Sequence, residues 1–184
     1  MKYWNTPALA LTFVVAVALA TGCKDDHPTP AAAPDPAKPG ATALPPTLRL
    51  AAAPAGAKDV AAVRAAAPRD GDRVIVRGVI AGRADPIAPT RAILTLLDPA
   101  IKTCDKEADD TCKTPWDACC VPADERTRNS VTVQVVDPQG HPLKTSLASV
   151  DGVKPLARLV VAGTAKVTPD GTLLINADGV FVER

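Results

Sequence analysis

Arg-Val-Ile-Val-Arg-Gly-Val-Ile-Ala-Gly-Arg, residues 73–83, is the stretch that decides the fold. It is rich in β-branched residues, which pack well on the pleated surface of a strand. Gly78 stands inside the run, where a glycine predicts a bulge or a sharp bend. We therefore expect a long, coiling strand that begins at Arg73.

Four further runs, each bounded by turn residues, are predicted to be strands: 92–97, 130–136, 158–167 and 172–182. Thr168-Pro-Asp-Gly171 predicts a hairpin between the last two. Five strands with a coiling first strand and a closing hairpin are the parts of a small Greek-key barrel, and their order resembles an OB-fold. The resemblance implies a mainly β architecture and no particular activity. A split β-sandwich or another β-barrel is the competing architecture.

A short helix is expected before the first strand. Asp59 is a candidate N-cap, Val60, Val63 and Ala67 form an apolar stripe among alanines, and Pro68 ends the segment. The barrel domain is predicted to cover residues 57–184.

The N-terminus has the order of an export signal. Lys2 supplies a positive charge, the run from Ala8 to Ala20 is uncharged and apolar, and Leu19-Ala-Thr-Gly-Cys23 resembles a bacterial lipobox. The apolar run is well short of the ~20 residues of a membrane-spanning helix. We therefore expect residues 1–22 to be a lipoprotein signal peptide, and Cys23 to be the lipidation site and first residue of the mature protein.

The lipidated protein is expected in the cell envelope, because two or three acyl chains hold a protein stably on a membrane. The residue directly after Cys23 is Lys24 rather than an aspartate. By analogy with enterobacterial sorting, this favours a periplasm-facing position on the outer membrane.

Residues 23–56 are predicted to be a disordered tether rich in alanine and proline. The segment holds almost no large apolar side chains besides Leu44, Leu48 and Leu50, so it cannot bury enough surface to offset its ordering entropy. Docking of these leucines on the domain is the alternative.

The predicted insertion 98–129 contains all four cysteines of the domain: Cys104, Cys112, Cys119 and Cys120. An even number of cysteines in an oxidising compartment predicts two disulfides that staple the loop. Because a bond between the adjacent Cys119 and Cys120 would be strained, two pairings remain open, 104–119 with 112–120, or 104–120 with 112–119. We therefore expect no metal and no cofactor.

A tetrathiolate zinc site is the first alternative for these cysteines. Adjacent ligands are awkward for a tetrahedral ion, and the usual pairs spaced by two to four residues are missing. Redox catalysis is the second alternative, and it lacks the usual Cys-x-x-Cys pair.

The same loop carries Thr114-Pro-Trp-Asp-Ala-Cys-Cys120. This element, with the strand rhythms around it, resembles a group of uncharacterised exported and lipid-anchored bacterial proteins of planctomycete type, in which a Thr-Pro-Trp-Asp-x-Cys-Cys element recurs. The resemblance covers most of the domain and implies no mechanism. Trp116 and Asp117 are possible interaction residues, since large aromatics anchor interfaces. The alternative is that Trp116 packs over a disulfide as a local core.

No catalytic residue is predicted. The acidic run from Asp105 to Asp110 lacks the glycine and the final glutamate of a calcium loop. His141 lies in a turn-like sequence, and Ser130 has neither nucleophile-elbow glycines nor a second domain histidine to partner it.

Charge and aromatic content argue against nucleic acid as a partner. The chain has 21 basic and 20 acidic side chains, and a mature chain would keep only Trp116 and Phe181 for base stacking. Two classes stay open. The first is a non-enzymatic envelope module that binds a protein or a glycan, and the second is a thiol-redox or metal-binding protein that uses the loop cysteines.

Overall fold

The computed structural model describes residues 43–107 and 112–184. The predicted signal peptide, the lipidation site Cys23 and the tether up to residue 42 lie outside the described residues. None of the helices in the described ranges has the length and apolar character that crossing a bilayer demands.

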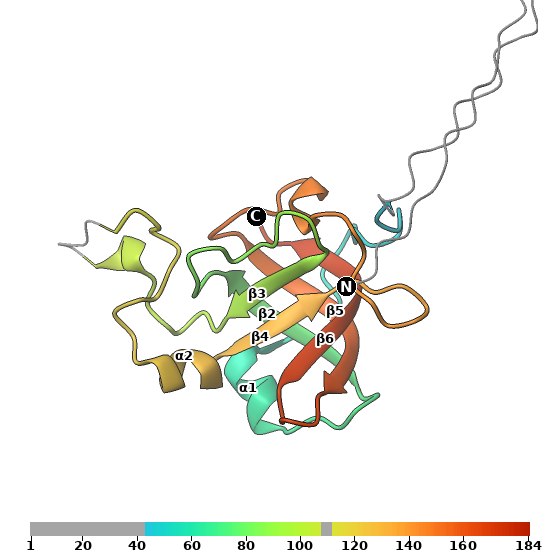
Figure 1. The fold of residues 1–184 in the computed structure, drawn as a ribbon, viewed down its shortest axis with the longest axis horizontal. Helices are drawn as coiled ribbons and strands as arrows, with labels where there is room; N and C mark the ends of the chain where they lie inside the picture. Colours follow the sequence, from blue (N-terminus) through green and yellow to red (C-terminus); the bar gives the residue numbers. More distant parts are fainter. Residues whose placement is uncertain (1–42, 108–111) are drawn as a thin grey trace, which may run out of the picture. The chain divides into compact units, whose positions relative to one another are not determined.

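A closed β-barrel forms the centre of the domain (Figure 1). In the described residues its strands are β2 (Arg73–Ile80), β3 (Ile93–Leu97), β4 (Ser130–Gln134), β5 (Arg158–Val167) and β6 (Leu173–Val182). They are paired in the order β2-β3-β4-β6-β5, and antiparallel pairing of β2 with β5 closes the ring. The mainly β, OB-fold-like prediction is confirmed, and the closing pair rules out an open sandwich.

The strand order is that of a Greek key, because β6 pairs with β5 as an antiparallel hairpin and with β4 in parallel. The predicted turn after β5 is present: the Gly171 N–H donates to the Thr168 carbonyl at 2.8 Å, and Gly171 has φ +80°. A positive φ of this kind explains the glycine at that position.

Alternating side chains of the strands fill the barrel. The buried side chains of the barrel interior include Val76, Ile80, Leu94, Leu96, Val133, Leu159, Val161, Ile175 and Val180. Gly78 lets β2 approach its neighbour, since a Cβ there would lie 3.0 Å from the Leu96 Cβ and from the Leu97 carbonyl oxygen. In the described strands a register shift lies elsewhere, between Ala162 and Gly163 in the β5–β6 pair.

The predicted helix is present as α1 (Val60–Ala65), directly after the short strand β1 (Lys58–Asp59), and it buries Val60 and Val63. Asp59 occupies the N-cap position, but its side chain makes no capping hydrogen bond. The buried carboxylate of Asp98, from the end of β3, accepts the Ala61 N–H at 2.7 Å instead. A residue far away in the sequence therefore caps this helix.

The domain begins earlier than the sequence predicts. Leu48, expected in the tether, is 1% exposed and belongs to the main core. Backbone hydrogen bonds join this segment to β6: Val180 N–H to the Leu48 carbonyl at 2.6 Å and Leu50 N–H to the Val180 carbonyl at 2.8 Å. The stretch around Leu48 is thus packed on the barrel, because one buried leucine and two backbone bonds offset its ordering cost.

The connection from β3 to β4 projects from one side of the barrel (Figure 1). The sequence predicts a long loop here, and its described part contains two short helices, η1 (Cys104–Lys106) and α2 (Ala123–Arg128). Another short helix, η2 (Leu147–Ser149), lies between β4 and β5.

Candidate functional site

The described cysteine-bearing residues 101–107 and 112–121, here called the cysteine loop, are attached to the barrel next to the end of β2. The Gly82 N–H donates to the Trp116 carbonyl at 2.9 Å, and the Trp116 indole N–H donates to the Ala84 carbonyl at 2.8 Å. Ala118 of the loop also packs with Ala81 and Leu97 in a small second hydrophobic core. The half-buried Trp116 is therefore an anchor of the loop.

A turn brings two parts of the loop together. The Asp117 N–H closes the turn on the Thr114 carbonyl at 2.8 Å. Cys104 and Asp105 then donate their backbone N–H groups to the carbonyls of Asp117 and Pro115, both at 2.8 Å. This pairing places Cys104, on η1, beside the cysteines that follow the turn.

Three of the four thiols converge. The Sγ atoms of Cys104 and Cys119 are 3.3 Å apart, and the Sγ atoms of Cys104, Cys112 and Cys119 all lie within 4.8 Å of one another. Cys104 is buried, Cys112 is half-buried and Cys119 is exposed. We call these three residues the thiol triad. Cys120 is exposed and is not part of this group.

Within the described ranges no disulfide joins these cysteines. The two predicted disulfides therefore stay a prediction. Of the two pairings left open by the sequence, the short distance between the Cys104 and Cys119 sulfurs favours 104–119 with 112–120.

The surroundings shift the thiols in opposite directions. The pKa of Cys112 is lowered, mainly because the Thr114 hydroxyl, 3.3 Å from its sulfur, and then the Thr114 N–H stabilise a thiolate. The contact with Cys104 works to lower the pKa of Cys119, but desolvation and the neighbouring thiols of Cys120 and Cys112 outweigh it and raise that pKa. Of Cys112 and Cys119, Cys112 is thus the thiol that ionises more readily.

A pocket of about 250 Å³ opens beside the triad. Cys104 and Cys120 both contribute to its wall, together with Lys102, Glu107 and Glu125. The buried Cys104 therefore borders a small opening lined by charged side chains of both signs.

The remaining residues weighed from sequence lie away from the triad or have structural roles. His141 is exposed, with Nδ1 3.6 Å from Asp137, in the turn after β4. Asp117 accepts the Ala118 N–H at 2.7 Å through its own carboxylate. Asp117 contacts the thiol triad through its backbone, because its carbonyl accepts the Cys104 N–H, while its carboxylate is engaged by Ala118.

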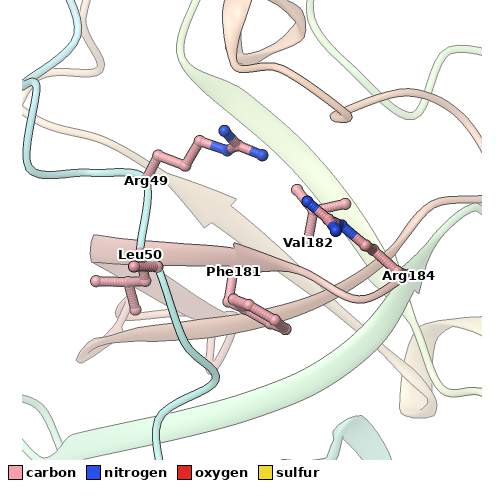
Figure 2. Close-up of a pocket in the computed structure, with 6 residues that line it drawn as sticks. Arg49, Leu50, Phe181, Val182 and Arg184 are labelled. Carbon is pink, nitrogen blue, oxygen red and sulfur yellow. The ribbon is translucent and has the colours of Figure 1, made fainter.

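A second pocket lies where the end of β6 meets the segment around Leu50 (Figure 2). Its volume is about 570 Å³. Figure 2 shows Arg49 and Arg184 extending over one side and Phe181 over the other. Sequence reasoning missed this pocket because it assigned Arg49 and Leu50 to the tether. Arg49 is already engaged by Asp151 at 3.1 Å.

Fold and site together define a class: a mainly β, OB-fold-like barrel that carries cysteines on an inserted loop. No protein-family model matches the sequence, and no curated protein matches it either.

Proposed function

We propose that this protein is a membrane-anchored envelope lipoprotein, held through Cys23, whose barrel acts as a non-enzymatic binding or interaction module. The observation that carries the proposal is the attachment of the cysteine loop to the barrel by the paired hydrogen bonds of Trp116 with Gly82 and Ala84. A loop held in one arrangement loses less conformational entropy on binding than a free one. The barrel then serves as a scaffold and the loop as the contact surface for a protein or glycan of the envelope.

The anchor is tested by replacement of its cysteine. A Cys23→Ser variant should leave the membrane fraction or stall in processing, whereas the unaltered protein should partition with membranes and carry acyl chains on its N-terminal residue. Recovery of the unaltered protein without lipid, cleaved elsewhere and freely soluble, would contradict the anchor.

The contact surface is tested by site-specific photocrosslinking in intact envelopes. A photoreactive residue replaces exposed Lys113 in the cysteine loop or, as the matched control, exposed Lys144 in the connection between β4 and β5. We expect discrete adducts from position 113 and not from position 144. Equal adducts from both positions, or none from position 113, would remove the loop as the interaction surface.

A second candidate function is favoured by the thiol triad. Three sulfurs gathered within 4.8 Å on an anchored loop are a starting point for soft-metal binding or thiol–disulfide chemistry. Thiol titration separates the two candidates: a stapled binding module exposes no domain thiols before strong reduction, while a thiol or metal site exposes them after chelation or mild reduction.

A further inference from the structure

We propose that the reduced thiol triad binds one copper(I) ion through the sulfurs of Cys104, Cys112 and Cys119, and that oxidation of Cys104 and Cys119 to a disulfide releases it. This inference deepens the second candidate function and rests on it. It names the ligand, the three donor atoms and the reaction that controls binding.

The spacing of the sulfurs fits a three-coordinate ion. With metal–sulfur bonds of ~2.3 Å, the sulfurs of a planar trigonal site stand about 4.0 Å apart. The Cys104 and Cys119 sulfurs are closer than this, at 3.3 Å, and no pair of the triad exceeds 4.8 Å. Side-chain shifts below an ångström therefore suffice to form the site.

The donor set selects the metal. Soft thiolate ligands favour copper(I), zinc and iron–sulfur clusters. Structural zinc sites take four protein ligands in a tetrahedron, whereas the cluster found in the described residues has three cysteines and neither a histidine nor a carboxylate. Cys120 directly follows Cys119, and adjacent residues are poorly placed to occupy two positions around one ion. Three sulfurs without a fourth protein ligand suit copper(I) better than zinc.

The protein holds the three donors before any ion arrives. The Cys104 N–H is bonded to the Asp117 carbonyl, and the Thr114 hydroxyl lies 3.3 Å from the Cys112 sulfur. Trp116 ties the same turn to the barrel through Ala84. Groups of this kind orient ligands, and their loss elsewhere costs 10–100-fold in metal affinity.

The same geometry supplies the release step. A small-molecule disulfide RSSR, such as oxidised glutathione, accepts two electrons from the Cys104 and Cys119 thiolates. One S–S bond forms between these residues, the S–S bond of RSSR breaks, and two protons from solvent complete two RSH molecules. Copper keeps its +1 state and retains a single protein sulfur, that of Cys112, so it dissociates.

The binding test uses the full mature chain with Cys23→Ser, so that the loop holds all its thiols. Anaerobic, reduced protein is titrated with copper(I) in competition with a chromophoric copper(I) chelator. We expect one ion per chain and at least a tenfold loss of affinity in Cys112→Ser. The matched control Cys120→Ser, which removes an exposed neighbouring thiol, should stay within about twofold. Failure to compete for copper(I), or equal losses in both variants, would overturn the proposal.

The release test adds oxidised glutathione to the copper-loaded protein. Copper should pass to the chelator as a bond between Cys104 and Cys119 appears in peptide maps, and copper that stays bound after that bond forms would refute the switch. Cys112→Ser should still form this bond, which shows that the variant is folded.

The outcomes also distinguish this inference from the broader function. Stoichiometric zinc binding without copper(I) binding overturns the inference and leaves the thiol-site function standing. If instead the four cysteines form two disulfides that only unfolding makes reducible, both fail.

Discussion

Replacement of Leu48 by alanine tests whether the segment before residue 57 belongs to the folded domain. Leu48 is 1% exposed and contacts the main core. The change removes three carbon groups, worth ~0.8 kcal/mol each in transfer from water. A cavity term adds to this, and buried Leu→Ala changes cost about 2–5 kcal/mol in all. We therefore expect a loss of about 3 kcal/mol in the free energy of unfolding.

The measurement is urea and thermal unfolding of the mature chain with Cys23→Ser, followed by circular dichroism. A loss of this size should lower the Tm by roughly 10 °C for a domain of this length. Thr47→Ala is the matched control, because Thr47 is exposed in the same segment and surface changes usually stay within about 0.5 kcal/mol. If Leu48→Ala and Thr47→Ala unfold at the same temperature, the packing of this segment on the barrel is refuted.

Three further outcomes are expected. Under oxidising conditions, mass spectrometry should find two disulfides, seen as a mass four hydrogens below the reduced form, with Cys104 linked to Cys119. The Cys104–Cys119 bond closes a separation of 15 residues, and the chain-entropy model gives it about 3 kcal/mol of stabilisation. A peptide that links Cys104 to Cys120 would contradict this pairing. Asp98→Ala should lower the free energy of unfolding by about 2 kcal/mol or more in urea denaturation, because the Ala61 and Ala100 N–H groups lose their acceptor. Asp59→Ala is the control and should lower it much less. Equal losses in the two variants would contradict capping by Asp98. Fluorescence anisotropy should detect no binding of a single-stranded oligonucleotide, since Trp116 and Phe181 lie in different parts of the surface; micromolar, salt-sensitive affinity would contradict this.

The strands could be predicted because their signals are local. Turn residues and β-branched runs mark each strand, and the β5 range 158–167 agrees at both ends with the structure. The barrel then follows from their number and order. Leu48 could not be placed in this way, because an isolated leucine among prolines and alanines has no periodicity. Its burial depends on a pairing with β6, more than a hundred residues later.

The candidate site likewise has features that are local in sequence and features that depend on tertiary contacts. The cysteines and the Thr114–Cys120 element stand out in the sequence, but which sulfurs converge depends on backbone bonds between Cys104 and Asp117. The N-cap of α1 is a similar case. Asp59 stands at the expected position, yet Asp98 accepts the hydrogen bond across the fold. Such contacts depend on tertiary structure that no spacing rule contains.

The bridge between Leu48 and Val180 has a mechanical consequence. If the chain is held at Cys23, any pull between membrane and barrel is transmitted through this bridge, which includes two backbone hydrogen bonds, one buried leucine and the exposed ion pair of Arg49 with Asp151. It is weaker than the closed ring of strands and would therefore yield first. Its release would free the chain up to β1, about ten residues or roughly 30 Å of extra reach, while the barrel stays folded. Reversible release of the segment around Leu48 would thus lengthen the chain between Cys23 and the barrel under tension.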